Sequence, residues 1–333
     1  MKNTTINITV PVYNRFYLTQ KTILNLRKLD SSIAFFINVV DNGSSEELRN
    51  ILIKFANDKI IDNLFLINKN MGVACAANIG WNCIDADFFI KIDNDIIIKD
   101  FKFIDHIFDM MCYVESNSAF GPALLKKMIN NSELIKETPY GKLALCKNSL
   151  PGGALIIPKS ISDVIGKFNE EYGLYGAEDG DYGARVALAG FKQYFYEYEK
   201  FFSHEGKWDS SEYKDYGLDK KKEYDKLFRV DNNGVGLFPL NLWLYQFCIR
   251  SWKTPQRFEI CEKNGYNIKV KEKSSYKDIQ KALLISKKAL EYNTVRKQGK
   301  YMIKSHKTIG TVINKLKNIW KNCGQECTLE NLL

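Results

Sequence analysis

Two aspartates separated by one residue follow a largely apolar run near the middle of the chain. The run Phe88 to Ile92 has the length of a β-strand, and Asp93 and Asp95 come directly after it. Ligands bind α/β sheets at the carboxyl ends of the strands, so these carboxylates are expected at a binding edge. Two carboxylates leaving a strand on a bend can hold one hard cation and leave positions for water and phosphate oxygens. The same spacing occurs elsewhere in the chain, so the interpretation rests on position after a strand.

The segments before this strand alternate between strand and helix patterns. Strands are predicted over 6–12, 34–40 and 64–67, and helices over 17–29, after 46, and over 73–81. This rhythm predicts right-handed crossovers and an α/β fold with a mainly parallel central sheet. The small residues of the 73–81 helix would let it lie close to the sheet. Four polar clusters end successive strands and therefore share one edge: Tyr13-Asn14-Arg15, Asp41-Asn42, Asn70-Met71-Gly72 and Asp93-Asn94-Asp95.

The following segment is less regular. Residues 126–150 lack clear periodicity and are interpreted as a mobile loop or insertion over the site. A strand is predicted over 152–157, and an aromatic loop over 172–177 leads into Glu178-Asp179 at the start of a helix. A late strand over 194–202 is followed by His204.

Composition limits the class of protein. The 333 residues are 45% hydrophobic, and the chain has ample length for a core. No apolar stretch is long enough for a membrane span, and no export signal is recognised at the start, so a cytoplasmic protein is expected. The 8 cysteines lack paired CxxC spacing and are expected to be reduced thiols.

The net charge of +9 is concentrated in the tail. Residues 251–333 carry 18 basic and 7 acidic residues, whereas the first 250 residues have a net charge of −2. A helix near the end places apolar residues from Ile309 to Trp320 in one arc and lysines in the rest. This pattern fits either peripheral contact with the inner face of an anionic membrane or packing on the rest of the protein. No basic-aromatic signature accompanies the charge, so nucleic-acid binding is not favoured.

Taken in order, these motifs resemble the family 2 glycosyltransferases, inverting enzymes of the GT-A fold that build bacterial surface polysaccharides. The resemblance covers about residues 5–206 and rests on the four strand-end clusters together with Ala77-Asn78-Ile79-Gly80 and Gly176-Ala177-Glu178-Asp179. It implies a Rossmann-like three-layer catalytic domain over 1–206, with a nucleotide-sugar half over 1–100 and an acceptor half over 101–206. Residues 207–333 would form a basic, mostly helical extension.

The resemblance also assigns residues to the donor. Pro11, Tyr13 and Asp41 look like the wall that holds the base, with Asp41 accepting the imide hydrogen of uracil or thymine. Asn70 and Gly72 resemble the segment against which the nucleoside lies. Asn14 and Arg15 belong to the same donor-binding edge. The donor expected from this resemblance is a UDP-sugar, with dTDP and GDP sugars left open.

Metal and acid-base roles follow in the same way. Asp95 looks like the direct ligand of Mn2+ or Mg2+, Asp93 like a ribose and metal contact, and His204 like a further metal ligand of some members. Asp179 resembles the general base that takes the proton of the acceptor hydroxyl, and Glu178 is the reserve candidate. The acceptor would be a glycan or a lipid-linked molecule.

Other interpretations stay open. Asp41 could cap the helix after its strand, Asn14-Arg15 could form an ordinary turn, and Asp179 could be an acid at a helix N-terminus. A sugar-1-phosphate nucleotidyltransferase would need a glycine-rich loop after the first strand, but residues 11–16 contain no glycine. An NAD-dependent oxidoreductase would need GxGxxG there. A non-catalytic glycan- or nucleotide-binding module remains as the third alternative.

Overall fold

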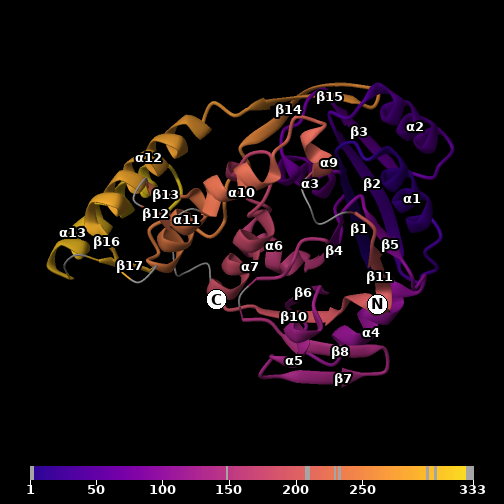
Figure 1. Ribbon diagram of the computed structural model, residues 1–333, viewed down its shortest axis with the longest axis horizontal. Coiled ribbons are helices and arrows are strands. Elements are labelled where there is room, and N and C mark those ends of the chain that lie inside the picture. The colour runs from indigo at the N-terminus through magenta and orange to yellow at the C-terminus, as the bar shows by residue number, and fades with distance from the viewer. Residues whose placement is uncertain are drawn as a thin grey trace.

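The computed structural model describes residues 4–147, 149–206, 211–228, 230–231, 234–297, 300–303 and 306–327. Its first part alternates strands and helices along the chain (Figure 1). The elements are β1 (Thr5–Val12), α1 (Phe16–Leu26), β2 (Ala34–Asn42), α2 (Glu46–Asn57), β3 (Asn63–Ile67), α3 (Val73–Trp81), β4 (Phe88–Ile92), β5 (Ile96–Ile98) and α4 (Phe103–Met111). This is the predicted α/β order, and α3 has the predicted bounds.

The second part adds strands to the other side of the same sheet. The elements are β6 (Ser118–Ala123), α5 (Lys126–Asn130), β7 (Ile135–Thr138), β8 (Gly141–Leu145), β9 (Ala154–Pro158), α6 (Lys159–Ile165), the 3-10 helix η1 (Glu170–Tyr172), α7 (Glu178–Leu188), β10 (Lys192–Glu197), α8 (Tyr198–Phe201) and β11 (Phe202–His204). The prediction of a loop over 126–150 is therefore wrong. A helix and a hairpin occupy it, and β8 pairs with β10.

One sheet of 11 strands holds the fold together, in the order β14-β15-β3-β2-β1-β4-β9-β6-β10-β8-β7. Strands β15, β3, β2, β1 and β4 pair in parallel, and β6 pairs in parallel with β10. Only β14, β9 and β8 run against the others among the described strands of this sheet. The prediction of an α/β fold with a mainly parallel sheet is confirmed.

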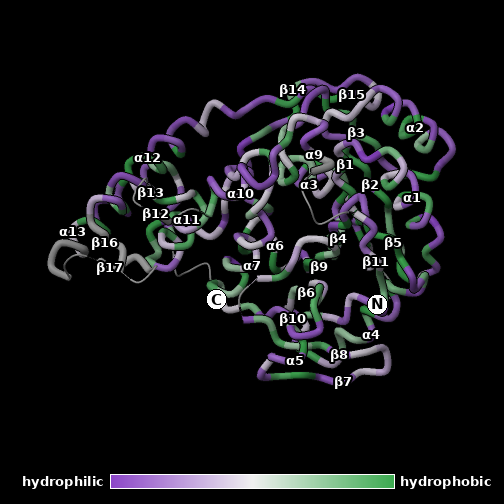
Figure 2. Tube along the Cα trace, in the orientation of Figure 1, coloured by the Kyte–Doolittle hydropathy of each residue, from purple (hydrophilic) through white to green (hydrophobic). Residues whose placement is uncertain are grey.

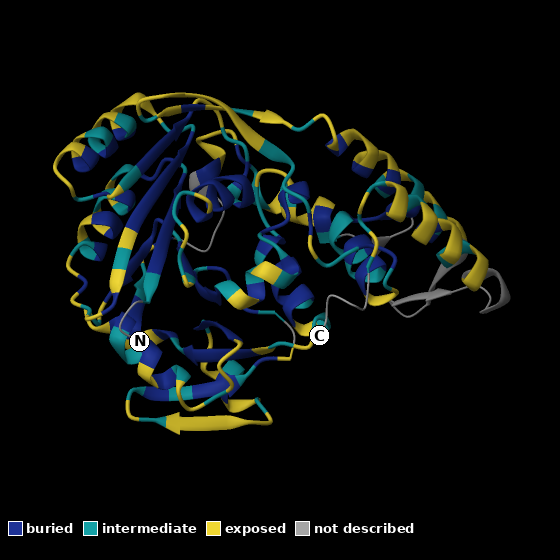
Figure 3. Ribbon diagram, turned by 180° about the vertical axis from the view of Figure 1, so that it is seen from behind, coloured by how far each residue is buried: buried dark blue, intermediate teal, exposed yellow. Residues whose placement is uncertain are grey.

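Helices cover both faces of the sheet and make three layers. On one face, α1, α2 and α4 pack on alternate residues of β1, among them Ile6, Ile8 and Val10. On the other face, α3, α6 and α7 share a core with β4. Alternating hydrophobic and hydrophilic residues along α1 and α2 fit helices with one buried face (Figure 2). The central strands are buried, whereas β7 at the edge is exposed (Figure 3).

Close packing of α3 on the sheet depends on its small residues, as the sequence predicts. A Cβ atom at Gly80 would lie 2.4 Å from Cγ2 of Thr9 on β1. Asn7 on the same strand donates a hydrogen bond to the Gly80 carbonyl at 2.9 Å. A side chain at position 80 would therefore push α3 away from β1.

The C-terminal extension contains helices, one hairpin that joins the central sheet, and two separate strand pairs, β12 (Val230–Asp231) with β13 (Gly234–Val235) and β16 (Thr294–Lys297) with β17 (Lys300–Ile303). Its elements include α9 (Ser211–Lys214), α10 (Lys220–Phe228), α11 (Leu237–Gln246), β14 (Phe258–Asn264), β15 (Asn267–Glu272), α12 (Tyr276–Asn293) and α13 (His306–Asn322). Strand β15 pairs with β3, so the extension contributes to the sheet of the first 206 residues. Helices α12 and α13 project from this body (Figure 1).

Helix α13 uses its apolar arc inside the protein. Leu316 is 2% exposed and Trp320 is fully buried, and both lie in one core with α11 and α12. The side chain of Ile309, at the start of the predicted arc, lies outside the described residues. The arrangement therefore favours the packing interpretation of the tail over insertion of this arc into a membrane. No described helix has the length and apolar character needed to cross a bilayer.

Candidate active site

A cavity of about 660 Å³ opens at the carboxyl ends of β1 and β4. Most of the residues predicted from the sequence line it: Pro11, Tyr13, Arg15, Asn70, Asp93, Asp95, Glu178, Asp179 and His204. Three predicted residues, Asn14, Asp41 and Gly72, are not among its lining residues. The sheet thus brings together residues from five separate stretches of the chain.

Asp95 is the centre of a cluster of polar side chains. Its Oδ2 atom accepts a hydrogen bond from Nη1 of Arg15 and lies 3.4 Å from Nε2 of His204. His204 reaches this position because β11 pairs with β5, which places His204 opposite Ile96. The Oδ1 atom of Asp95 is buried and has no hydrogen-bond partner among the described residues. Burying a carboxylate oxygen without a hydrogen-bond partner costs free energy, so this oxygen is suited to bind a cation.

The fit to a divalent metal is partial. Asp95 and His204 offer an oxygen and a nitrogen in one place, which suits Mn2+. Asp93 instead directs Oδ1 at the Lys91 ammonium, 2.7 Å away. Within the described residues, no group of three or more His, Cys, Asp or Glu side chains is placed to hold a metal ion. A metal here would therefore need further ligands from a bound phosphate compound.

Asn14 has a structural role in the loop after β1. Both Asn14 and Arg15 have positive φ angles, of 55° and 58°. The side-chain Oδ1 atom of Asn14 accepts a hydrogen bond from the backbone amide of Ser45 at 3.0 Å. The backbone amide of Asn14 donates to Oγ of Ser44 at 2.8 Å. Asn14 therefore joins the β1 loop to the β2 loop, and this turn directs Arg15 toward Asp95.

Asp41 is fully buried and does not line the cavity. Its Oδ1 atom accepts from the Ser44 amide at 3.2 Å, and its Oδ2 atom lies 3.2 Å from Nε of Arg49. Burial raises the pKa of Asp41, while Ser44 and Arg49 act in the opposite direction. Its neighbour Asn42 lines the cavity in its place. The helix-cap alternative is not seen either, because Ser45 provides the α2 cap.

Gly72 allows two loops to approach each other. Its φ is 95°, and a Cβ atom there would lie 2.1 Å from the Gly173 carbonyl oxygen. Its amide donates to Oδ1 of Asn70 at 2.9 Å. Gly72 thus fixes the distance between the Asn70 loop and the aromatic loop that precedes α7.

Lys91 is a site residue that the sequence analysis missed. Its Nζ atom lies 2.7 Å from Asp93 Oδ1, 3.1 Å from the Gly152 carbonyl and 3.8 Å from Glu178 Oε1. Burial alone would lower the pKa of Lys91, but the charges of Asp93 and Glu178 raise it overall. The ammonium therefore stays charged and links the donor side of the cavity to α7. A lysine inside an otherwise apolar strand was the available signal.

Glu178 and Asp179 begin α7 and face the cavity in different environments. Glu178 is 7% exposed, and its Oε2 atom has no hydrogen-bond partner among the described residues. Burial, followed by the charge of Asp179, raises the pKa of Glu178 to about 7. Asp179 is half-buried, and its two oxygens accept from the Gly152 and Gly180 amides, each at 2.8 Å. Asp179 is thus held in a fixed orientation at the cavity wall.

The raised pKa of Glu178 predicts a pH-dependent effect on stability. The folded protein holds this proton up to about pH 7, whereas the unfolded chain releases it near the ordinary value of 4.5. Stability is therefore lost as pH rises from 4.5 to 7 and stays low above that. We expect Glu178→Gln to raise the melting temperature by a few °C at pH 8 relative to wild type, and by much less at pH 5, in thermal unfolding experiments. An equal change at both pH values would contradict the shift.

Buried ion pairs hold α7 in place. Asp181 accepts hydrogen bonds from Nε of Arg185 at 2.6 Å and from the Tyr172 hydroxyl at 2.7 Å. Next to Tyr172, the Glu171 carboxylate receives both terminal nitrogens of Arg250, one of them at 2.7 Å. Asp181 is therefore a structural acid. Arg250 follows α11, so the C-terminal extension helps to fix the helix that carries Glu178 and Asp179.

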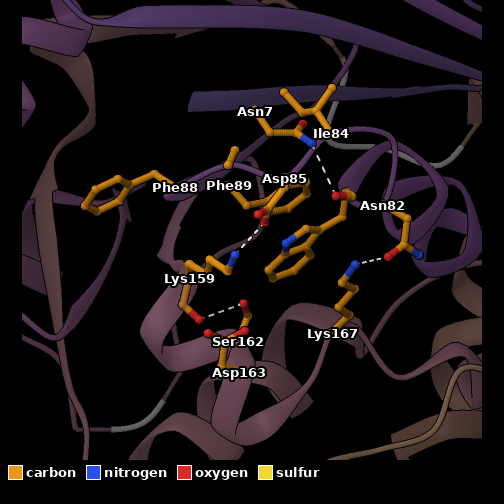
Figure 4. Close-up of a pocket in the computed structure, with 12 residues that line it drawn as sticks. Asn7, Asn82, Ile84, Asp85, Phe88, Phe89, Lys159, Ser162, Asp163 and Lys167 are labelled. Atoms are coloured by element: carbon orange, nitrogen blue, oxygen red, sulfur yellow. Dashed lines mark hydrogen bonds and ion pairs between the residues drawn. The ribbon is translucent and has the colours of Figure 1, made fainter. Parts of the chain in front are cut away.

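A second, smaller cavity of about 210 Å³ lies near the start of β4 (Figure 4). Lys159 pairs with Asp85 at 2.5 Å, and Lys167 donates to the Asn82 side chain. Burial lowers the pKa of Lys167 to about 8. No residue predicted for the site lines this cavity. Its lining mixes lysines with aspartates, and the clustered carboxylates, Arg15 and His204 line only the larger of these two cavities.

Comparison with known proteins finds one family model that matches the first part of the chain. Residues 7–112 match the sequence model of glycosyl transferase family 2. This segment contains the strand-end clusters from Pro11 to Asp95. The match to the family 2 glycosyltransferase model covers about a third of the chain. No curated protein matches the chain.

Three solved structures are similar to part of this chain at low sequence identity. The mannosyltransferase PcManGT from Pyrobaculum calidifontis, in complex with GDP-Man and Mn2+, is 16% identical over 58% of this chain and 54% of its own, with a TM-score of 0.46. S. aureus TarS 1-349 in complex with UDP-GlcNAc is 17% identical over 62% and 61%, with a TM-score of 0.45. GalNAc-T7 with UDP, GalNAc and Mn2+ is 11% identical over 60% and 43%, with a TM-score of 0.47. The chain thus covers between 43% and 61% of these three structures.

Proposed function

We propose that the protein transfers a sugar from a nucleotide-diphosphate donor to a hydroxyl group of an acceptor, with inversion and with help from a divalent cation. The observation that carries this proposal is the convergence of Asp95, His204 and Arg15 with Glu178 and Asp179 on one cavity. At one end of the cavity, Asp95, His204 and Arg15 could bind a diphosphate and its cation. At the other end, a carboxylate of Glu178 or Asp179 could accept a proton. A UDP-sugar is the donor we favour, and a glycan or lipid-linked acceptor in surface polysaccharide synthesis fits this chemistry.

The donor end would hold the nucleotide between loops. Tyr13 and Pro11 form a wall, and Asn70 faces the same space. Asp95 and His204 would hold Mn2+ or Mg2+, which supplies positive charge to the diphosphate as the sugar leaves. Arg15, which pairs with Asp95, would also be placed to donate a hydrogen bond to a phosphate oxygen of the donor.

The acceptor end would remove a proton. We assign Asp179 as the base: it accepts the hydroxyl proton while the acceptor oxygen forms a bond to the anomeric carbon. The bond from that carbon to the donor oxygen breaks at the same time, and the nucleoside diphosphate leaves with the electron pair. Glu178 remains the reserve base, and Lys91 keeps it and Asp93 in place.

Metal-dependent binding of the nucleotide tests the donor end. We expect UDP and Mn2+ together to raise the melting temperature of the wild type by several °C, and more than the sum of the separate shifts, because a ligand that binds only the folded state stabilises it. Asp95→Asn should lose this joint shift. Asp163→Asn, at an exposed carboxylate beside the second cavity, is the matched control.

The outcomes separate the alternatives. A joint shift with GDP or dTDP in place of UDP would change the nucleotide and keep the class. If no nucleotide raises the melting temperature of the wild type, with or without Mn2+, the proposal is wrong. Slow Mn2+-dependent hydrolysis of the UDP-sugar in the absence of an acceptor would exclude a purely binding module.

A further inference from the structure

Three aromatic residues of the C-terminal extension form one continuous surface in the cavity. Tyr224 and Phe228 lie on α10 and stack with ring centroids 4.1 Å apart, and Phe228 lies 4.6 Å from Phe238 on α11. All three line the cavity. We call Tyr224, Phe228 and Phe238 the aromatic ledge. Tyr224 is 47% exposed, so the ledge presents apolar ring surface to a ligand in the cavity.

The ledge touches the chain on both sides of the two acids. A Cβ atom at Gly176 would lie 3.5 Å from Cδ2 of Tyr224, and one at Gly180 would lie 3.3 Å from Cε2 of Phe238. Glu178 and Asp179 lie between these two glycines in the sequence. The absence of side chains at 176 and 180 therefore brings the aromatic rings to the backbone that carries the acids. Helix α11 also packs on α7, which fixes the ledge relative to Asp179.

We infer that the aromatic ledge is the acceptor subsite and that it binds the ring of a saccharide acceptor, with one hydroxyl directed at Asp179. This inference rests on the proposed function. Aromatic faces carry negative partial charge and attract the weakly positive C–H face of a pyranose ring, while the hydroxyl groups of the ring need polar partners. The ledge supplies the apolar face, and Asp179 with the Gly152 loop supplies polar groups nearby.

The position of the ledge separates it from the donor end. Asp95, Arg15 and His204 come from the β1, β4 and β11 ends, whereas the ledge comes from α10 and α11 beside α7 (Figure 1). Tyr213 and Lys220 lie between the two ends: the Arg15 guanidinium is 4.6 Å from the Tyr213 ring, and the Lys220 ammonium is 3.6 Å from the same ring. Loss of a ledge ring should therefore affect acceptor binding and leave donor binding unchanged.

The test uses the full chain with UDP and Mn2+ and a panel of methyl glycopyranosides as probes. Saturation-transfer NMR measures whether the ring protons of each glycoside contact the protein. We expect at least one glycoside to bind the wild type, and Phe238→Ala and Tyr224→Ala each to weaken it about tenfold, as loss of one aromatic contact implies. Phe247→Ala is the matched control, because Phe247 directly follows α11, packs on Trp243 at 5.2 Å and does not line the cavity.

The readouts distinguish failure of this inference from failure of the proposed function. The joint thermal shift by UDP and Mn2+ reports the donor end and should be equal in the wild type and all three variants. If that shift is present but no glycoside binds the wild type, or if the ledge variants bind it as the wild type does, the ledge is not the acceptor subsite. If Tyr224→Ala and Phe238→Ala abolish the nucleotide shift, the ledge serves the donor and the inference is overturned.

Discussion

Replacement of Asp179 by asparagine is expected to reduce sugar transfer by about 10² to 10⁴ fold while leaving donor binding intact. The reason is that asparagine cannot take the proton of the acceptor hydroxyl, and the hydroxyl is a poor nucleophile until that proton leaves. Donor binding depends on the opposite end of the cavity, around Asp95 and His204. Release of nucleotide from a UDP-sugar with and without a saccharide acceptor measures the two steps separately.

The local geometry sets the controls for this variant. Both Asp179 oxygens accept backbone N–H groups, from Gly152 and Gly180, and an asparagine NH2 group would oppose one of these donors. Thermal unfolding must therefore show that Asp179→Asn remains folded. Glu178→Gln provides the comparison on the neighbouring residue. If Asp179→Asn transferred sugar at the normal rate and Glu178→Gln did not, Glu178 would be the base.

Replacement of Glu171 by glutamine is expected to destabilise the folded protein by about 3 to 5 kcal/mol, because it leaves the Arg250 guanidinium buried without its counter-charge. Both side chains are almost fully buried, at 3% and 0% exposed. The pair joins η1 to the extension, and the Arg250 guanidinium also lies 4.7 Å from the Trp320 ring of α13. Urea unfolding monitored by tryptophan fluorescence measures the loss as a lower midpoint.

A second arginine–glutamate pair provides a matched control. Arg257 and Glu272 are 2.6 Å apart, with side chains that are 27% and 37% exposed. Glu272→Gln makes the same chemical change in contact with water and should cost less than about 1 kcal/mol. Equal losses for the two variants would show that the Glu171 pair does not fix the extension. Since η1 leads into α7, we also expect slower transfer by folded Glu171→Gln.

The sequence predicted the parallel part of the fold well because its signals are local. Buried parallel strands appear as continuous apolar runs, and the small residues of α3 have no good alternative to close helix packing. Strands β7 and β8 were missed because β7 is exposed along most of its length and shows no apolar alternation. The β14–β15 hairpin had a readable signal, since Asn264-Gly265 marks the turn where β14 ends. The pairing of β15 with β3 had no readable signal in the sequence.

The sequence predicted which residues belong to the site better than it predicted how their side chains are arranged. Strand-end position placed Asp95 and Asp179 on one cavity, but it did not distinguish Asp41 from Asn42, because one residue along a strand reverses the direction of the side chain. The ion pair of Arg15 with Asp95 depends on two consecutive non-glycine residues with positive φ, which sequence propensities disfavour. The aromatic ledge comes from α10 and α11, which are distant in sequence from the strand-end clusters, and its residues form no recognisable motif.

The pairing of β15 with β3 has a consequence for synthesis of the chain. Ile67 is paired with Ile268, about 200 residues later. At translation rates of 5 to 20 residues per second, the outer edge of β3 would wait about 10 to 40 s on the ribosome for its neighbour. During that interval its unpaired amide and carbonyl groups could recruit strands of other nascent chains. The order of emergence thus makes β3 the place where a chaperone would do most to protect this protein.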